Sequence, residues 1–294
     1  MRVPCLHFTQ VDVFTTRPLS GNSLAVFLDG RGLSTARMQA IAREMNLSET
    51  TYLLPPTARG ADARVRIFTV ETELPFAGHP TLGTAFIVAS RGPRRAEIRL
   101  QTKAGVIPVR IDRRRSGAYL EMRQIDPVFG PTVDQGRLAR LLGLRPADFD
   151  RRALPQVVST GLPFLIVPLR SSPALDRLAP DFSLLLPFLR SLKVDMAYYL
   201  VTGGHDLEAR MFTPAFEDPG TGSAAGCSAA YLVRHGLRPP DRPFQIRQGH
   251  RIHRPCLITA CASLAGDRAH NVRVGGYVVP VLDGRLLRGP WGGL

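Results

Sequence analysis

Residues 66–78, RIFTVETELPFAG, return in the second half of the chain as residues 210–222, RMFTPAFEDPGTG. In this register six residue types coincide, in the pattern R-x-F-T-x-x-x-E-x-P-x-x-G, and each copy runs into a stretch of small apolar residues, 82–89 and 224–233. Such an internal repeat indicates a duplicated structural unit. We therefore expect two similar domains, each with a strand that ends at Phe-Thr, a tight Pro/Gly loop and a helix that begins at the glycine.

The residues around the two copies predict a chain rich in strands. Ser34 is expected to cap a helix over 34–45, a second helix is expected to begin at Arg137, and 127–132 is interpreted as a linker. The expected fold class is mixed α/β (α+β), with two pseudo-symmetric halves that face each other. Alternating apolar residues predict strands at 11–14, 24–28, 51–54, 63–68, 97–102, 105–111, 118–123 and 164–168.

The composition is basic without the features of a nucleic-acid-binding protein. The 294 residues include 38 Lys and Arg against 24 Asp and Glu, which gives a net charge of +14. The arginines are scattered along the chain, only 7% of residues are aromatic, and no helix-turn-helix, RNP or zinc-finger pattern occurs. We expect a basic, solvated surface that steers small anionic molecules to the protein, and no nucleic-acid partner.

Other functional classes are also disfavoured. No apolar run approaches the ~18 residues of a membrane span, and residues 1–12 lack a secretory signal, so we expect a cytoplasmic protein without a membrane partner. The four cysteines show no metal-binding spacing, and the expected metal site is none. Neither a G-x-G-x-x-G after a strand nor a P-loop is present, so no cofactor is expected.

The two glycine loops are candidate anion sites. A helix that begins at Gly78-His79 or at Gly222-Ser223 leaves backbone N–H groups without partners and directs its positive dipole end outward. Two such helix starts facing each other across a domain cleft would hold a substrate with a carboxylate. The structural alternative is that the glycines only allow the turns that start the helices.

Three ionisable side chains near these loops are candidates for proton transfer. His79 lies in the first turn of its helix, where we expect the dipole to lower the pKa and favour neutral imidazole. Asp218 directly precedes the second loop, and Glu49 lies in a polar turn before a strand. Taken singly, each has a structural interpretation: a core histidine, a turn-capping carboxylate and a surface glutamate. Together they indicate a cleft enzyme with acid/base groups.

Several motifs together resemble the PhzF-like family of isomerases of phenazine biosynthesis. The resemblance covers nearly the whole chain and implies a diaminopimelate-epimerase-like fold, in which each domain is a curved mixed sheet around a central helix. It implies domains at 1–127 and 128–279, with 280–294 packing back onto the first. The motifs are VDVFT at 11–15, GN at 21–22, NLSET at 46–50, ELPFAGHPT at 73–81, EDPGTGSAA at 217–225, QG at 248–249, RP at 254–255 and VRVGG at 272–276.

The resemblance also implies an activity and roles for residues. The founding activity of the family converts trans-2,3-dihydro-3-hydroxyanthranilate to its keto form, without metal or organic cofactor, in a homodimer. Glu49 would take a proton from the substrate ring and return it elsewhere. The implied polarising side chains are His79, Asp218 and Ser223, and the implied substrate-binding residues are Gly78, Thr221 and Gly222.

Three residues depart from the family pattern, and they leave other functions open. Ser23 replaces a proline, and His253 and Cys227 replace smaller residues, so these two could reshape the pocket. An epimerase of this fold that uses two thiols would have cysteines where Ala77 and Pro219 lie, so both thiols are missing. The remaining alternatives are a thiol-independent racemase or epimerase and a non-catalytic protein that binds a small molecule.

Overall fold

The computed structural model describes residues 5–204 and 207–287, and the chain divides into two compact units. Unit 1 contains the described residues up to Met122 and those from Gly275 onward, and unit 2 contains Arg123–Val274. The long strand β16 (Arg268–Leu287) belongs to unit 2 in its first part and to unit 1 in its second part. The domain boundaries expected from the sequence lie after residue 127 and after residue 279.

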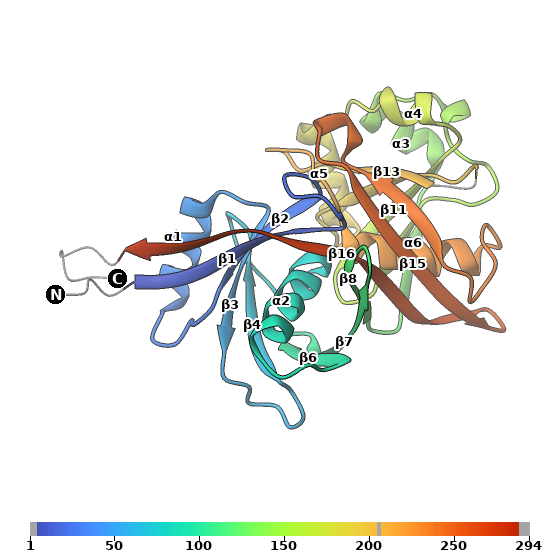
Figure 1. Cartoon of the computed structure of the whole chain (residues 1–294). Helices are drawn as coiled ribbons and strands as arrows, with labels where there is room; N and C mark the ends of the chain where they lie inside the picture. Colours follow the sequence, from blue (N-terminus) through green and yellow to red (C-terminus); the bar gives the residue numbers. More distant parts are fainter. Residues whose placement is uncertain (1–4, 205–206, 288–294) are drawn as a thin grey trace. The chain divides into compact units, whose positions relative to one another are not determined.

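Unit 1 is built around a single sheet. Its strands follow the order β1-β2-β3-β4-β6-β7-β8-β16, and β16 also pairs antiparallel with β1, so the sheet closes on itself. The first and last described strands of the chain therefore lie side by side (Figure 1). The elements are β1 (Cys5–Val13), β2 (Asn22–Phe27), α1 (Thr35–Met45), β3 (Glu49–Leu54), β4 (Ala63–Phe68), β5 (Glu73–Leu74), α2 (Gly78–Arg91), β6 (Glu97–Thr102), β7 (Gly105–Arg114) and β8 (Gly117–Arg123).

Helix α2 fills the inside of this sheet. It packs against β1, β2, β3, β4, β6 and β7, and ten of its 14 residues are buried. Small residues permit this close packing: a Cβ added at Gly83 would lie 2.6 Å from Cδ2 of Leu24 and 3.0 Å from Cγ2 of Val11. The first turn of α2, which carries Gly78 and His79, is consequently enclosed by strands.

Strand β3 has a different helix on each face. Thr51 points to α2, where its hydroxyl lies 2.9 Å from that of Thr84. Tyr52 points the opposite way, and its hydroxyl donates a 2.7 Å hydrogen bond to the carbonyl of Met38 in α1. Because side chains alternate along a strand, Glu49 is on the same face as Thr51. The fold therefore directs the Glu49 side chain toward α2.

Unit 2 repeats the plan of a curved sheet around a helix of small residues. The strand order is β16-β15-β14-β13-β12-β11-β10-β9, and α6 packs against β10, β11 and β15 with 12 of its 13 residues buried. The elements are β9 (Val128–Thr132), α3 (Gln135–Leu142), η1 (Pro146–Asp148), β10 (Gln156–Ser159), β11 (Pro163–Leu169), α4 (Ser172–Asp176), α5 (Phe182–Ser191), β12 (Ala197–Val201), β13 (Leu207–Met211), α6 (Gly222–Arg234), β14 (Phe244–Gln248), η2 (His250–Ile252) and β15 (Cys256–Ala265).

The repeated arginines and glutamates form equivalent ion pairs in the two units. Arg66 donates to Glu73 through Nε and Nη2, at 2.8 and 2.7 Å. Arg210 donates to Glu217 through the same two atoms, at 3.0 and 2.7 Å. All four side chains are largely shielded from solvent, and a two-point contact of this kind also orients its partners. Each pair joins the end of a strand to the loop that leads into the central helix.

The repeated phenylalanines and threonines complete the same local structure. Each arginine guanidinium lies over the aromatic ring two residues later in the chain, 5.1 Å from the ring centre of Phe68 and 4.5 Å from that of Phe212. The hydroxyl groups of Thr69 and Thr213 each accept hydrogen bonds from the backbone N–H groups of the residues two and three positions later in the loop. Most of the matches that reveal the repeat therefore serve the scaffold.

The expected linker at 127–132 is wrong. Residues Val128–Thr132 form β9, which pairs antiparallel with β10, with Val128 opposite Ser159 and Thr132 opposite Gln156. A proline and a glycine are tolerated there because β9 is the edge strand of its sheet. The expected helix cap is confirmed, since the Ser34 hydroxyl accepts the backbone N–H of Arg37 at 3.2 Å.

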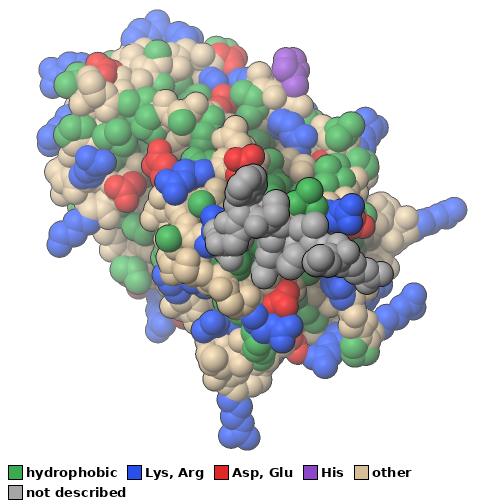
Figure 2. Space-filling view, turned by 90° about the vertical axis from the view of Figure 1, so that its left-hand side faces the viewer, with side chains coloured by type: hydrophobic (Ala, Val, Ile, Leu, Met, Phe, Trp, Pro, Cys, Tyr) green, Lys and Arg blue, Asp and Glu red, His purple; other side chains and the backbone are tan. Residues whose placement is uncertain are grey.

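Basic side chains are spread over the surface. On the face in Figure 2, lysine and arginine side chains stand apart from one another and among acidic side chains. Several arginines of unit 1 pair with a nearby aspartate, as Arg31 does with Asp29 at 2.7 Å. Among the helices of the described residues, none has the length and apolar character needed to cross a membrane.

Candidate active site

Glu49 and His79 lie together in unit 1. Oε2 of Glu49, at the start of β3, is 3.3 Å from Nε2 of His79, in the first turn of α2. The two atoms are close but are not aligned as a hydrogen bond. The His79 side chain is only 3% exposed, whereas that of Glu49 is 15% exposed. The carboxylate is therefore the member of the pair that a small molecule can approach.

Asn22 holds the other side of the imidazole. It is buried at the start of β2, which runs parallel to β3, and its Nδ2 lies 3.1 Å from Nδ1 of His79. Neighbouring groups of unit 1 therefore hold the Nδ1 side of the ring, and Nε2 is the ring nitrogen that lies beside Glu49.

Burial keeps His79 neutral. Removal from water disfavours the imidazolium and lowers the pKa of His79 to about 3, against a smaller opposing effect of the Ser23 backbone. The expected direction of the shift is confirmed, but burial rather than the helix dipole is its main cause. At any pH near 7 the imidazole beside Glu49 is therefore uncharged.

Asp218 and Thr221 form a buried turn in unit 2. The hydroxyl of Thr221 donates to Oδ2 of Asp218 at 2.5 Å, and the backbone N–H of Asp218 donates to the carbonyl of Met211 at 2.9 Å. The turn leads directly into α6, whose first residues are Gly222 and Ser223. Four residues of this segment are candidate site residues from the sequence, and all four are buried: Asp218, Thr221, Gly222 and Ser223.

Gln248 fixes this turn from the end of β14. Its Oε1 accepts the backbone N–H of Thr221 at 3.0 Å, and its Nε2 donates to the carbonyl of Asp218 at 2.8 Å and to the Thr221 hydroxyl at 2.9 Å. The hydroxyl of buried Tyr198 also donates to Oε1, at 2.9 Å. One amide side chain therefore connects two strands to the loop that carries Asp218.

A second amide, Gln124, holds the start of α6. Its Nε2 donates to the carbonyl of Gly222 at 3.0 Å, and its Oε1 accepts the Thr160 hydroxyl at 2.6 Å. Gly226 leaves the space for this side chain, because a Cβ there would lie 1.8 Å from Oε1 of Gln124. The backbone of the first turn is fixed in this way, while no hydrogen bond from the Ser223 hydroxyl is recorded among the described residues.

The helices that begin at Gly78 and Gly222 differ from the other long helices at their N-termini. Ser34, Asp134 and Asp181 cap α1, α3 and α5 by accepting a backbone N–H. Helices α2 and α6 have no side-chain cap, although their first residues are buried. Ala77 offers no cap, and Thr221 directs its hydroxyl to Asp218 instead. Buried, uncapped helix starts are sites where an anion can bind.

Cys227 is not placed to act as a thiolate. It is fully buried in α6, beside the Thr160 hydroxyl at 3.4 Å and the carbonyl of Leu162 at 3.6 Å. Burial raises the pKa of the thiol to about 11. His253, the other residue that departs from the family pattern, caps η2 in a left-handed conformation with φ of 58°. No group of three or more His, Cys, Asp or Glu residues that could bind a metal occurs within 5–204 and 207–287.

The structure thus collects the expected residues into two groups, one in each unit. Group 1 contains Glu49, Gly78 and His79, and group 2 contains Asp218, Thr221, Gly222 and Ser223. The sequence did not assign Asn22, Gln124 or Gln248, which position these side chains. Asn22 and Gln248 do belong to the GN and QG motifs, so the sequence marks their positions as an amide beside a motif glycine but does not show which groups they bind.

The chain was compared with known proteins. The family model of phenazine biosynthesis-like proteins, PhzC-PhzF, matches residues 11–284. A trans-2,3-dihydro-3-hydroxyanthranilate isomerase from Pseudomonas aeruginosa is 38% identical over 283 residues, which cover 95% of this chain and 98% of that protein. The solved structure of a predicted epimerase from Pseudomonas aeruginosa has a TM-score of 0.85 at 39% identity and covers 97% of this chain and 100% of that chain. A probable proline racemase from Agrobacterium radiobacter, at 11% identity, has a TM-score of 0.69 over 98% of this chain and 94% of that chain.

Proposed function

Because this chain belongs to the PhzC-PhzF family of phenazine biosynthesis-like proteins and is an isomerase, we propose that it moves a proton within a small, carboxylate-bearing substrate. Glu49 takes the proton from one carbon and returns it to another. The substrate is a cyclic amino or hydroxy acid. The relative named for trans-2,3-dihydro-3-hydroxyanthranilate supports that compound as the first to test.

One observation carries the proposal. Each unit has a buried helix start without a side-chain cap, at Gly78 and Gly222, and each has a carboxylate within the same local network, Glu49 or Asp218. The N–H groups of a helix start bind a carboxylate, and the neighbouring side chain acts on the rest of the molecule.

Glu49 is the proton carrier. It is exposed enough to reach a substrate, and the neutral imidazole of His79 lies beside its carboxylate, with Nε2 3.3 Å from Oε2. A carboxylate removes a proton from a ring carbon and becomes a carboxylic acid, the electron pair delocalises over the substrate, and the acid then protonates a second carbon. No external oxidant, reductant or cofactor is needed for this exchange.

Asp218, Thr221 and Ser223 bind the polar groups of the substrate. Gln248 and Gln124 hold their backbone in place before substrate arrives, so little ordering remains to be done on binding. We also propose that the enzyme is a homodimer that requires no metal.

The direct test is an isomerisation assay with matched variants. Purified chain is mixed with trans-2,3-dihydro-3-hydroxyanthranilate, and the loss of substrate is followed by absorbance and by NMR. Glu49→Gln should abolish most of the turnover, whereas Glu44→Gln, which makes the same charge change at an exposed site in α1, should leave it unchanged. Equal turnover in the two variants would contradict the role of Glu49.

A second candidate is a racemase or epimerase, because the solved relative at 39% identity carries the name of a predicted epimerase. A two-thiol mechanism has little support: Ala77 and Pro219 occupy the thiol positions, and the pKa of Cys227 is raised to about 11. A thiol-independent epimerase would invert a stereocentre and leave the connectivity of the substrate unchanged. Chiral chromatography of the product, next to the NMR assay, separates the two reactions.

A further inference from the structure

A pocket of about 440 Å³ lies in unit 2, and no residue of group 2 lines it. It is bounded by η1, by the loop between η1 and β10, and by the residue that follows β11. Three of its six lining residues are arginines. The lining residues are Ala147, Phe149, Asp150, Arg151, Arg152 and Arg170.

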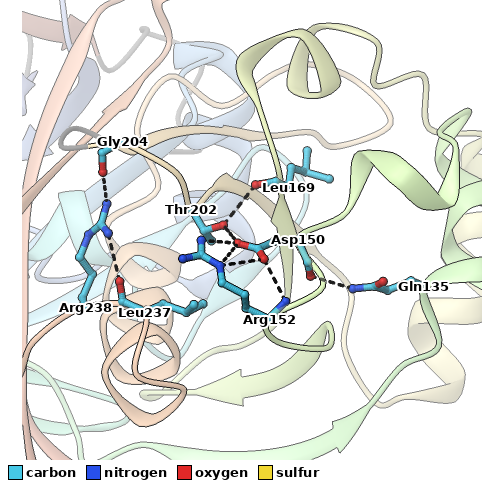
Figure 3. A network of polar contacts seen from close by, with 8 residues as sticks. All are labelled: Gln135, Asp150, Arg152, Leu169, Thr202, Gly204, Leu237 and Arg238. Carbon is cyan, nitrogen blue, oxygen red and sulfur yellow. Dashed lines mark hydrogen bonds and ion pairs between the residues drawn. The ribbon is translucent and has the colours of Figure 1, made fainter.

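The single carboxylate in this lining is engaged by the protein. Asp150 is buried and accepts hydrogen bonds from Nε and Nη2 of Arg152, at 3.0 and 2.6 Å, and from the Thr202 hydroxyl (Figure 3). Although burial alone raises the pKa of Asp150, the hydrogen bonds from Arg152 and Thr202 lower it to about 2. The negative charge of Asp150 therefore compensates the positive charge of Arg152 and leaves the other arginines of the pocket uncompensated.

The same contacts fix Arg152 in place. Its backbone N–H donates to Asp150 at 2.9 Å, and its guanidinium contacts both carboxylate oxygens. The backbone carbonyl of Asp150 in turn accepts Nε2 of Gln135 at 2.9 Å, which ties the loop to α3 (Figure 3). An arginine held in this way binds a ligand at lower entropic cost than a mobile one.

The surrounding charges leave the pocket positive. Arg151 and Arg170 are exposed, and no ion pair of either is recorded within residues 5–204 and 207–287. Asp148, next to the pocket, is already bound by two other arginines, Arg145 and Arg177. Guanidinium groups without carboxylate partners and in a concave site attract anions, since the field is stronger there than on a convex surface.

Arg238 adds to this positive charge. Its guanidinium donates to the backbone carbonyls of Leu237 and Gly204, at 3.0 and 2.6 Å, rather than to a carboxylate (Figure 3). Burial, and next the positive charge of Arg152, lower the pKa of Arg238.

We propose that this arginine pocket (Arg151, Arg152 and Arg170) binds a small polyanion, a molecule with two or more phosphate or carboxylate groups. Arginine binds both groups through paired N–H donors, so three guanidinium groups around one pocket match a ligand with several anionic groups. The volume is within the range of small-molecule sites. This site is separate from the isomerase residues and adds a second ligand to the protein.

The test is calorimetric titration with pyrophosphate and with citrate, which distinguish a phosphate ligand from a carboxylate ligand. The ionic strength is held at about 0.15 M, so that distant charges are screened beyond ~8 Å. The double variant Arg151→Gln, Arg170→Gln should weaken binding about tenfold or more, because two of three guanidinium groups are lost. Arg152 is left unchanged, since its removal would leave Asp150 buried without its main partner.

The control is the double variant Arg94→Gln, Arg115→Gln, which makes the same charge change at exposed positions of unit 1. It should bind the probe within about twofold of the unchanged protein. Equal weakening in both double variants would show bulk charge attraction and overturn the proposal, as would no binding of either probe up to about 10 mM. If the pocket variant unfolds, a crystal of the unchanged protein soaked in pyrophosphate decides, because the anion must contact Arg151 and Arg170.

Discussion

Replacing Glu49 with glutamine removes the proposed proton carrier and retains its shape. Glutamine is nearly isosteric with the carboxylate that lies 3.3 Å from Nε2 of His79, so binding should change little. His79 is no substitute base, because burial lowers its pKa to about 3, below the ~4.3 of an ordinary glutamate. We therefore expect the full loss typical of removing a general acid/base, about 10²–10⁴-fold in kcat, or about 2.7–5.4 kcal/mol.

The assay is steady-state kinetics with trans-2,3-dihydro-3-hydroxyanthranilate at pH 7. We expect kcat to fall as stated while KM stays within about threefold, since the carboxylate acts mainly in the transition state. Equal thermal unfolding of Glu49→Gln and the unchanged protein excludes a folding defect. A variant that retains more than about one tenth of kcat would refute the reasoning, because within the described residues Glu49 is the carboxylate paired with His79.

Four further outcomes are expected. His79→Gln should make the free energy of unfolding less dependent on pH in acid. Below pH 6.5 the His79 side chain binds a proton in the unfolded chain, whereas in the folded protein it binds one only near pH 3. Between pH 7 and pH 5 the unchanged protein should therefore lose about 2 kcal/mol more of its free energy of unfolding than the variant, as measured by urea unfolding. Gly249→Ala should lower the thermal stability of the protein more than Gly236→Ala does, as measured by thermal unfolding. Both glycines have a positive φ, but only the Cβ added at residue 249 would collide with backbone, at 2.3 Å from the carbonyl oxygen of Arg254. Iodoacetamide should leave turnover intact, since the Cys227 thiol is buried with a raised pKa, and inactivation would favour thiol chemistry. Native mass spectrometry after exhaustive chelation should show two chains with activity retained, and a monomer or a chelator-sensitive enzyme would contradict the dimer or the metal-free mechanism.

The internal repeat was the most informative feature of the sequence for the fold. The expected α/β class with curved sheets around central helices is confirmed, and so is its diaminopimelate-epimerase-like architecture, by the solved structures. The repeat was informative because its residues serve the scaffold: Arg66 with Glu73 and Arg210 with Glu217 hold equivalent loops. The strand at Val128–Thr132 was not predicted, because Gly130 and Pro131 suppress the local signal and pairing with β10 supplies the strand.

The sequence indicated the charged members of the site and not the residues that position them. Glu49 and His79 stand in motifs and carry ionisable groups, so they could be proposed from the sequence. Asn22 and Gln248 act through buried hydrogen bonds to residues distant in the chain, and local patterns do not encode such contacts. The sequence also could not show that burial lowers the pKa of His79, because the burial of this side chain depends on how the strands pack around α2.

The central claim is that the enzyme carries a proton from one substrate carbon to another on Glu49. The most direct measurement is NMR of trans-2,3-dihydro-3-hydroxyanthranilate incubated with the unchanged protein in deuterated water, with Glu49→Gln as the matched control. A carboxylate that holds the proton between the two steps exchanges it in part with solvent, so we predict deuterium at the newly protonated carbon of the product. With the variant, product formation and exchange should both be slower by about a hundredfold or more. Deuterium incorporation or product formation at equal rates in the two samples would contradict the account.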